Sequence, residues 1–365
     1  MQGIDMKDAL ASKAITLIAA VTFMLAFACA LGTPMQAHAS SRWIDCVTTG
    51  SGETFQTTRN LDTDTYTVSP SGDKSGRTDR VALGMVMSEC STYGQHWDHR
   101  NKAVTVNLVP GATYYIDVYI KLYDNVTVNA NGATIKQVTK GKGVFINALY
   151  KNSTDNKGAK KKLGGYKRCS NITVNGGTYI TTGKKSPTVG WSKNGWPGGY
   201  STFLFMHGQN IKISNVTIEN NYNGHFIEFA GIKNSSIENC TFQGSYVGDS
   251  GNEVIQLDTN YSISCSPSGS PWDGTCCKNI IVSGCNFNVP KMPKGIGTNN
   301  NCKKRSSNIT VTNNSFKVKK YAAYFCKCSK VTMSGNTFRK GKVYISKTAK
   351  KVKLSSSEKR AKTKK

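Results

Sequence analysis

Short segments in which apolar and polar residues alternate recur along most of the chain. A typical copy begins with Asn or Lys, forms one alternating segment, makes a short turn, and ends in a second alternating segment. Alternation with period two predicts strands that bury one face, and the copies show no helical stripe. The copies occupy residues 125–132, 171–179, 210–218, 234–242, 279–287, 308–316 and 330–338, and a shortened one begins at 351.

The spacing of the copies predicts how they stack. Aligned on the second apolar position of the first segment, successive copies are 39, 24, 45, 29 and 22 residues apart. The short intervals indicate a minimal coil, and the long ones indicate coils with inserted loops. Units of this length that bury apolar faces against their neighbours are typical of a solenoid. We therefore predict an all-β fold, a single-stranded right-handed parallel β-helix, with a β-sandwich as the alternative. The aligned residues are Val174, Ile213, Ile237, Val282, Val311 and Met333.

The coil model makes three local predictions. Inward Ile, Val and Phe side chains should stack in rows about 4.8 Å apart, the spacing between neighbouring strands. The corner Asn residues should adopt left-handed backbone conformations and hydrogen-bond to their counterparts one coil away. The end of a solenoid exposes unpaired strand edges and needs a cap. The helical apolar spacing of residues 79–90 predicts a capping helix at the N-terminal end.

The start of the chain has the features of an export signal. Lys7 and Lys13 precede a long apolar run, and the small residues Ala37 and Ala39 come directly before Ser40. These features predict a signal peptide over 1–39 and a secreted or extracellular protein, with no later stretch that could span a membrane. An uncleaved anchor is the alternative, because the apolar run is long enough to span a bilayer. The β-helix domain is then expected over 40–345.

The chain carries a formal net charge of +27. Outside the cell this charge favours anionic partners, such as an acidic polysaccharide, a cell-wall phosphate polymer or a membrane surface. Nucleic acid is disfavoured, because the chain is exported and has no nucleic-acid motif. Residues 346–365 are basic and lack apolar residues beyond Leu354, so we predict a disordered tail that contacts an anionic cell surface. The alternative is that the lysines only solubilise exposed strand edges.

Eleven cysteines follow the predicted signal, and an oxidising compartment permits disulfide bonds between them. Their odd number leaves at least one thiol outside any intramolecular pair. Cys240 and Cys285 occupy matching repeat positions, so we expect them to stack as small buried apolar groups. The predicted disulfide bonds join Cys46 to Cys90, Cys265 to Cys276 or Cys277, and Cys302 to Cys326 or Cys328.

The N-terminal part of the repeat carries a resemblance to a known family. The predicted capping helix is followed by a strand that leads into Pro110–Tyr115, then by the segments 125–128 and 132–135. This order resembles the entry to the pectin-lyase-like superfamily of right-handed parallel β-helices, over roughly residues 65–345. The resemblance implies a secreted bacterial β-helix protein distantly similar to pectate lyases and polygalacturonases. It is specific for architecture and only loosely specific for activity.

Three consecutive coils interrupt the repeat with polar residues, at 223–229, 251–258 and 294–300. If Ile227 and Ile255 point inward, Glu228 and Gln256 point outward from neighbouring coils. Neighbouring carboxylates shift one another's pKa, as catalytic pairs require. The candidate catalytic residues are His225, Glu228, Glu253, Asp258 and Lys294, and Tyr324 falls in the same outward column.

The resemblance implies two kinds of chemistry at these coils. In polygalacturonases the same coil positions carry acid and base aspartates, whereas this chain has Asn-Gly-His and Asn-Glu-Val there. Pectate lyases use calcium and a basic residue. By that analogy Glu228, Glu253 and Asp258 would bind Ca²⁺, and Lys294 or His225 would act as the base.

Two insertions carry aromatic residues that could stack on sugar rings, one over 181–202 and one over 259–277. We therefore predict a secreted carbohydrate-active protein, a lyase or glycoside hydrolase acting on an acidic polysaccharide. The alternative is a non-catalytic cell-surface adhesin or wall-associated glycan-binding protein. The candidate substrate-binding residues are Trp191, Trp196, Tyr200, Gln256, Trp272 and Tyr324.

Overall fold

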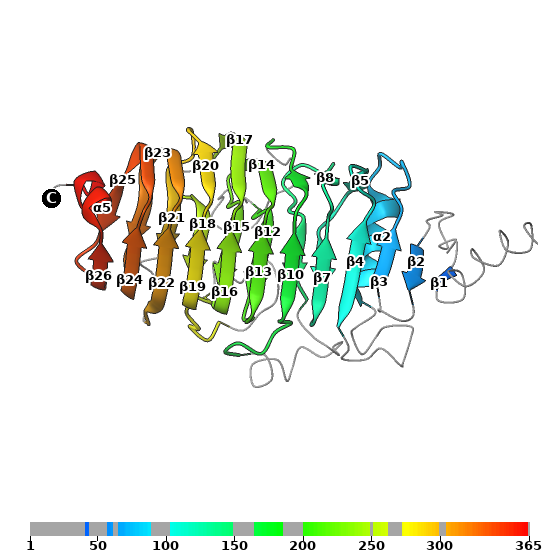
Figure 1. Cartoon of the computed structure of the whole chain (residues 1–365), viewed down its shortest axis with the longest axis horizontal. Helices are drawn as coiled ribbons and strands as arrows, with labels where there is room; N and C mark the ends of the chain where they lie inside the picture. Colours follow the sequence, from blue (N-terminus) through cyan, green and yellow to red (C-terminus); the bar gives the residue numbers. More distant parts are fainter. Residues whose placement is uncertain are drawn as a thin grey trace, which may run out of the picture.

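The strands of the chain stack side by side along one long axis (Figure 1). The N-terminal strands lie at one end of this stack, and a short C-terminal helix lies at the other. The computed structural model describes residues 41–43, 57–60, 65–88, 103–148, 164–184, 200–248, 251–261, 272–298 and 304–363.

Each full coil contributes three successive strands, and strands of the same kind pair in parallel with those of the neighbouring coils. We name the resulting faces sheets A, B and C. Sheet A contains β3 (Thr65–Val68), β4 (Val104–Leu108), β7 (Val126–Asn129), β10 (Ile172–Asn175), β13 (Ile211–Ser214), β16 (Lys233–Glu238), β19 (Lys278–Ser283), β22 (Ser306–Thr312), β24 (Cys328–Ser334) and β26 (Lys350–Leu354).

Sheets B and C join at the C-terminal end, because β23 is long enough to belong to both. Its first half pairs with β20 and its second half pairs with β21. Sheet B contains β5 (Thr113–Ile116), β8 (Thr134–Gln137), β11 (Thr178–Ile180), β14 (Thr217–Tyr222), β17 (Thr241–Val247) and β20 (Asn286–Val289). Sheet C contains β6 (Ile120–Leu122), β9 (Phe145–Asn147), β12 (Phe203–Met206), β15 (Ile227–Ala230), β18 (Glu253–Asp258) and β21 (Lys294–Thr298). The strands β23 (Ser315–Phe325) and β25 (Thr337–Ile345) complete both sheets.

The register predicted from the repeat is confirmed. Val174 pairs with Ile213, Ile213 with Ile237, and the series continues in step through Val282 and Val311 to Met333. The strands are parallel, and each interval between aligned residues is one turn of the solenoid. The fold is therefore a single-stranded right-handed parallel β-helix.

The corner asparagines also behave as predicted. Asn125, Asn171 and Asn210 have φ values of 62°, 56° and 55°, in the left-handed region that Asn tolerates better than most residues. The Asn171 side-chain amide donates to Oδ1 of Asn125 at 2.8 Å, and Asn210 donates to Asn171 at 2.9 Å. This ladder fixes the corner at which each coil turns from sheet C into sheet A.

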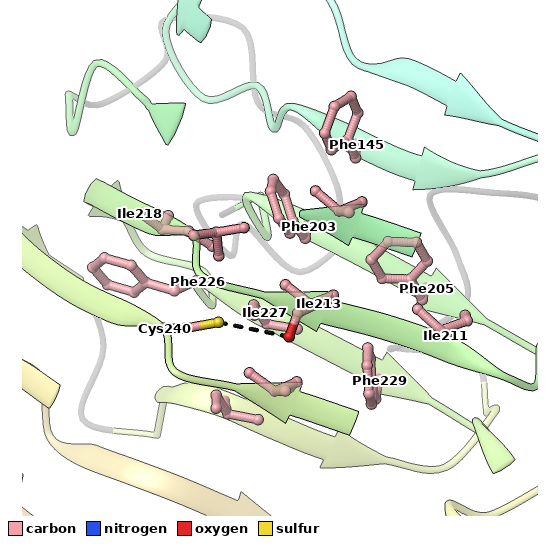
Figure 2. Packing of buried hydrophobic residues seen from close by; sticks show 14 of the residues in the cluster. Phe145, Phe203, Phe205, Ile211, Ile213, Ile218, Phe226, Ile227, Phe229 and Cys240 are labelled. Carbon is pink, nitrogen blue, oxygen red and sulfur yellow. Dashed lines mark hydrogen bonds between the residues drawn. The ribbon is translucent and has the colours of Figure 1, made fainter. Parts of the chain in front are cut away.

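Aromatic rings fill much of the interior (Figure 2). Phe287 stacks on Phe316 with ring centroids 4.5 Å apart, and on its other side it lies 5.0 Å from Phe242. Burying a side chain of this size removes enough apolar surface from water to contribute about 2–3 kcal/mol. Stacked rows of such rings therefore supply a large part of the driving force for the coil.

Cys240 and Cys285 lie in this interior as buried stacked groups, as predicted. The backbone amide of Cys240 donates to Sγ of Cys285 at 3.4 Å, and Sγ of Cys240 donates to the carbonyl of Ile213 at 3.7 Å (Figure 2). Every predicted disulfide bond involves at least one cysteine outside the described residues. Those four cysteines are Cys46, Cys90, Cys265 and Cys302.

A helix caps the N-terminal end, as predicted, but it begins and ends two residues earlier. Helix α2 (Arg77–Ser88) buries Leu83 and Met87 against the first coil. Its buried Asp79 accepts hydrogen bonds from the backbone amides of Ser71 at 2.7 Å and Tyr115 at 2.8 Å. The repeat did not predict strands β1 (Ser41–Trp43) and β2 (Thr57–Asn60), which extend sheet A in antiparallel fashion beyond β3.

The prediction of a disordered tail over 346–365 was wrong for most of this segment. Strand β26 pairs with β24, and helix α5 (Ser356–Ala361) follows it over the last coil. Glu358 is fully buried, and its Oε1 accepts hydrogen bonds from the backbone and side-chain amides of Asn336 at 2.9 and 3.0 Å. Glu358 thereby satisfies the amide groups that a further coil would have paired, and the end of the solenoid is capped.

Several predictions concern residues outside the described part of the chain. These include the signal peptide over 1–39 and the two tryptophans of the 181–202 insertion. Among the residues that the structure describes, no helix is both long and apolar enough to cross a membrane.

Candidate functional site

The polar coils meet on the outer face of sheet C, in one column of residues in register. Glu228 pairs with Gln256, Gln256 with Gly297, and Gly297 with Tyr324. The predicted outward column is therefore confirmed. It extends in both directions along the solenoid, and its members are Lys121, Ile146, Leu204, Glu228, Gln256, Gly297, Tyr324 and Tyr344.

Glu228 lies in this column between the inward residues Ile227 and Phe229. Although it points outward, only 8% of its surface is exposed. Its pKa is raised to about 7, chiefly by burial and also by the nearby charge of Glu253, while the hydrogen bond from Ser201 acts in the opposite direction. The Ser201 hydroxyl donates to Oε2 of Glu228 at 2.5 Å. Glu228 is thus a carboxyl group that can hold a proton close to neutral pH.

Glu253 lies at the start of the next strand and has a different partner. Lys294 approaches from the following coil, and its Nζ lies 2.7 Å from Oε1 of Glu253. The pKa of Glu253 is raised to about 6, because burial raises it by more than the charge and hydrogen bond of Lys294 lower it. Its other oxygen, Oε2, is buried without a hydrogen-bond partner. The ammonium group of Lys294 therefore stabilises the ionised form of Glu253. Glu228 has only a hydroxyl donor, which stabilises its ionised form less.

Gly297 makes room for this carboxylate. A Cβ atom at position 297 would lie 2.4 Å from Cγ and 2.7 Å from Oε1 of Glu253. Since real Cβ atoms do not approach other heavy atoms so closely, any larger residue would displace the Glu253 side chain. The glycine of the 294–300 coil is thus part of the site, although the sequence pattern did not identify it.

His225 lies beside Glu253, as predicted. Its Nδ1 is 2.9 Å from the carbonyl oxygen of Glu253 and 3.6 Å from the carboxylate oxygen Oε2. Burial lowers the pKa of His225 to about 4, so the imidazole is neutral at physiological pH. Asn221 holds the preceding turn, because its side-chain amide donates to the carbonyl of His225 at 2.9 Å and its Oδ1 accepts from Gly224 N at 3.0 Å.

Tyr324 belongs to an aromatic platform at the C-terminal end of the column. Its ring stacks on Tyr344 with centroids 4.8 Å apart, and Tyr321 lies 5.4 Å from it. Nζ of Lys294 lies over the Tyr324 ring, 4.7 Å from its centroid, which links the platform to Glu253. The sequence pattern identified Tyr324 alone. Tyr344 could have been found by extending the column one coil further.

Other predicted site residues are not part of this group. Asp258 lies two residues beyond Gln256 in β18 and pairs with Ala230, so it is outside the column. It is 2% exposed and accepts a hydrogen bond from Thr259 N at 2.6 Å. Trp272 is 58% exposed and lies shortly before β19 of sheet A. Its neighbour Asp273 accepts a hydrogen bond at Oδ2 from Gly165 N at 2.7 Å. Tyr200 precedes Ser201 and lies under Lys142, whose Nζ is 5.0 Å from its ring centroid. Trp191 and Trp196 lie outside the described residues.

The expected calcium ligands do not form a metal site. Within the described ranges, no group of three or more His, Cys, Asp or Glu side chains is arranged to hold a metal ion. Calcium takes six to eight oxygen ligands, and here Lys294 already places a cation against Glu253. Lys294 thus occupies the position beside Glu253 that a metal ion would take.

The fold and the site together define the chain as a parallel β-helix protein with two buried glutamates and a buried histidine on one outer face. No family model matches the chain. The plasmin and fibronectin-binding protein A of Streptococcus pneumoniae is 28% identical over 254 residues, which cover 63% of this chain and 34% of that protein. The chain thus spans about a third of the length of this curated relative.

Two solved structures of PfbA, a surface adhesin of Streptococcus pneumoniae, share the architecture. One matches with a TM-score of 0.52 and 19% identity, covering 73% of this chain and 62% of that one. The other matches with a TM-score of 0.50 and 20% identity, covering 70% of this chain and 61% of that one. At this level of identity the similarity shows the fold alone.

Proposed function

We propose that the chain is an extracellular carbohydrate-active β-helix protein that cleaves glycosidic bonds in an acidic polysaccharide. The observation that carries the proposal is the pair of buried carboxyl groups on sheet C, because the two groups have different hydrogen-bonding partners. Glu228 receives a hydroxyl hydrogen bond, and Glu253 is bound to an ammonium group. Environments that hold one carboxyl group protonated and the other ionised are what general acid–base catalysis requires.

In the hydrolytic form of the proposal, Glu228 protonates the leaving oxygen and Glu253 accepts a proton from the attacking water. One C–O bond of the glycoside breaks, and the elements of water are added across it. The tyrosine platform beside Lys294 would stack against a sugar ring, since aromatic faces pack well against the C–H groups of sugars. Gln256, between the two glutamates, would donate hydrogen bonds to sugar hydroxyls.

Lyase chemistry is the second catalytic form, and neutral His225 supports it. In the tautomer whose Nδ1–H is donated to the Glu253 carbonyl, the lone pair of His225 lies on Nε2 and would remove a C5 proton from a uronate. Lys294 would neutralise the uronate carboxylate and ease that proton abstraction. The pectin-lyase-like resemblance of residues 65–345 agrees with either form and chooses neither.

The non-catalytic alternative is a surface adhesin. Its support is the 28% identity to a protein named for plasmin and fibronectin binding, together with the fold shared with a surface adhesin. By this proposal the same face would bind a glycan or a host glycoprotein without turnover, and the protein would be located at the cell surface.

The decisive experiment incubates the purified chain with a panel of uronate-containing and neutral polysaccharides. We expect new reducing ends from hydrolysis, or products with unsaturated absorbance from elimination. Glu228→Gln and Glu253→Gln should each lower turnover by roughly 10²- to 10⁴-fold while leaving glycan binding largely intact. Glu238→Gln, at an outward position of sheet A, is the matched control and should keep full activity. Glycan binding without products from any substrate would support the adhesin alternative and contradict catalysis.

A further inference from the structure

The positive charge of the chain is concentrated at its C-terminal end. Residues 291–365 contain 22 Lys and Arg residues and one acidic residue, Glu358. That glutamate is fully buried against Asn336, so it does not offset the surface charge next to it. The first 290 residues hold the remaining 26 basic and 20 acidic residues, which nearly balance. The last coils therefore form a cationic pole.

Basic residues of this pole, together with Lys233 and Lys278 of earlier coils, line the corner where each coil turns from sheet C into sheet A. Lys233 pairs with Lys278 across neighbouring strands, and the same row continues through two serines to Lys350. Among the described residues, none of the lysines of this corner has a carboxylate within ion-pair distance. We call this band the basic corner, and its members are Lys233, Lys278, Lys304, Arg305, Lys327, Lys330, Lys347, Lys350 and Lys351.

The backbone at this corner indicates that the lysines have a role beyond solubility. Six earlier coils place Asn at the left-handed ladder position, and the last two place Lys330 and Lys351 there with φ values of 54° and 55°. Lys327 is also left-handed, with φ of 45°. A lysine lacks the short polar side chain that makes this conformation tolerable for Asn. Strained residues that persist are often placed by a functional requirement.

The chemistry of the corner selects the kind of ligand. Eight of its nine members are lysines, and the guanidinium of Arg305 donates to the carbonyl of Thr348. Ammonium groups act as point charges and lack the planar guanidinium geometry that binds carboxylates through two hydrogen bonds. A corner made of lysines therefore suits tetrahedral oxyanions of high charge density. Successive rungs are about 4.8 Å apart along a straight axis, whereas the phosphates of duplex DNA wind away from a straight row.

We propose that the basic corner binds a linear sulfated polysaccharide lying along the solenoid axis. The band is several residues wide, so a chain that bears charged groups on both edges can use its full width. A phosphate polymer with a single row of charges would leave the lysines at one edge of the band without an anionic partner. The proposal is independent of catalysis at Glu228, because the corner lies where the strands of sheet C have ended.

The test measures binding of a heparin oligosaccharide to the purified chain by calorimetry at several salt concentrations. The corner variant carries Lys327→Asn, Lys330→Asn and Lys351→Asn. At 330 and 351 this restores the residue that earlier coils use, and at 327 it places a residue that tolerates the left-handed backbone. The control variant carries Lys317→Gln, Lys319→Gln and Lys340→Gln, which remove the same charge from exposed positions of β23 and β25 in the same coils. The unfolding temperature of each variant should be no more than a few degrees below that of the wild-type chain.

We expect the corner variant to bind heparin at least roughly tenfold more weakly at 0.15 M salt, with a smaller salt dependence, and the control to lose little. Equal losses in the two variants would show diffuse charge attraction and overturn the proposal. Tighter corner-dependent binding of polyphosphate, duplex DNA or phosphatidylglycerol vesicles would overturn the choice of a sulfated polysaccharide. Absence of heparin binding by the wild-type chain would overturn it outright.

Discussion

The outer faces of sheets A and C have the same backbone geometry and differ completely in their side chains. On sheet A one outward column carries mainly small polar residues and lysines. Thr105, Thr127 and Thr173 are in register in its first part, and Thr310 and Thr332 follow later. On sheet C the corresponding column changes from Leu204 to Glu228, Gln256 and Gly297 within four strands. The parallel coil therefore requires only a residue that suits a strand, and we attribute the variety on sheet C to the proposed site.

The largest expected contrast between the two faces is in the pH dependence of activity. Catalysis needs Glu253 ionised, so kcat/KM should fall as pH drops below about 6, and it needs Glu228 protonated, so kcat/KM should fall as pH rises above about 7. Outside this window we expect roughly tenfold loss per pH unit. Glu238→Gln on sheet A should leave the profile unchanged. A profile that is flat from pH 5 to 9 would break the assignment of the acid–base pair.

Stability should show the second contrast. The raised pKa of Glu228 means that the unfolded chain releases its proton above about 4.5, whereas the folded chain keeps it until about 7. Glu228 therefore lowers the free energy of unfolding as pH rises from 4.5 to 7, by up to about 3 kcal/mol. Glu228→Gln removes this dependence, so its stability relative to wild type should increase over that range. Chemical denaturation at pH 5 and pH 8 checks this, and an equal difference at both values would contradict it.

The third contrast concerns the space around two glycines, Gly297 in the outward column of sheet C and Gly251 at the turn before β18. Gly297→Ala should lower the free energy of unfolding by roughly 1–3 kcal/mol and displace Glu253, because the added Cβ meets that side chain. Gly251→Ala is the matched control, since nothing lies within 4 Å of a Cβ at that position. Thermal unfolding of both variants, with activity as a second readout, separates local crowding from a general effect of alanine.

The smallest effect is expected on sheet A itself. Ile281 is 45% exposed in the column that otherwise carries small polar residues and lysines. Ile281→Thr should change the free energy of unfolding by no more than about 0.5 kcal/mol. A larger loss, measured by urea denaturation, would mean that the outer face of sheet A packs against something and is not a bare scaffold.

Much of the fold could be predicted because its causes are local and repeated. The alternation around Val174, Ile213 and Ile237 defines the strands, and the asparagines define the corners. The C-terminal cap was missed because it depends on one buried interaction. Glu358 lies 22 residues after Asn336, which is one minimal coil, yet a lone acidic residue in a lysine-rich segment has the composition of a disordered tail.

The site could be predicted as far as the register of the coils reaches. Glu228, Gln256 and Tyr324 share a column because period two places them there, and Lys294 meets Glu253 from the next coil. Asp258 was included for its chemistry, but it lies two residues further along the strand from the column. Ser201 and Gly297 were missed because a hydroxyl donor and an empty space leave no pattern in a single sequence.

The central claim is that Glu228 stays protonated close to neutral pH while other carboxyl groups are ionised. Infrared difference spectroscopy of the carboxyl stretch during a pH titration measures this directly and needs no substrate. We predict one protonated carboxyl band that disappears near pH 7 and is absent in Glu228→Gln. If every carboxyl group of the wild-type chain titrates below pH 5, the acid–base pair on sheet C does not exist as described.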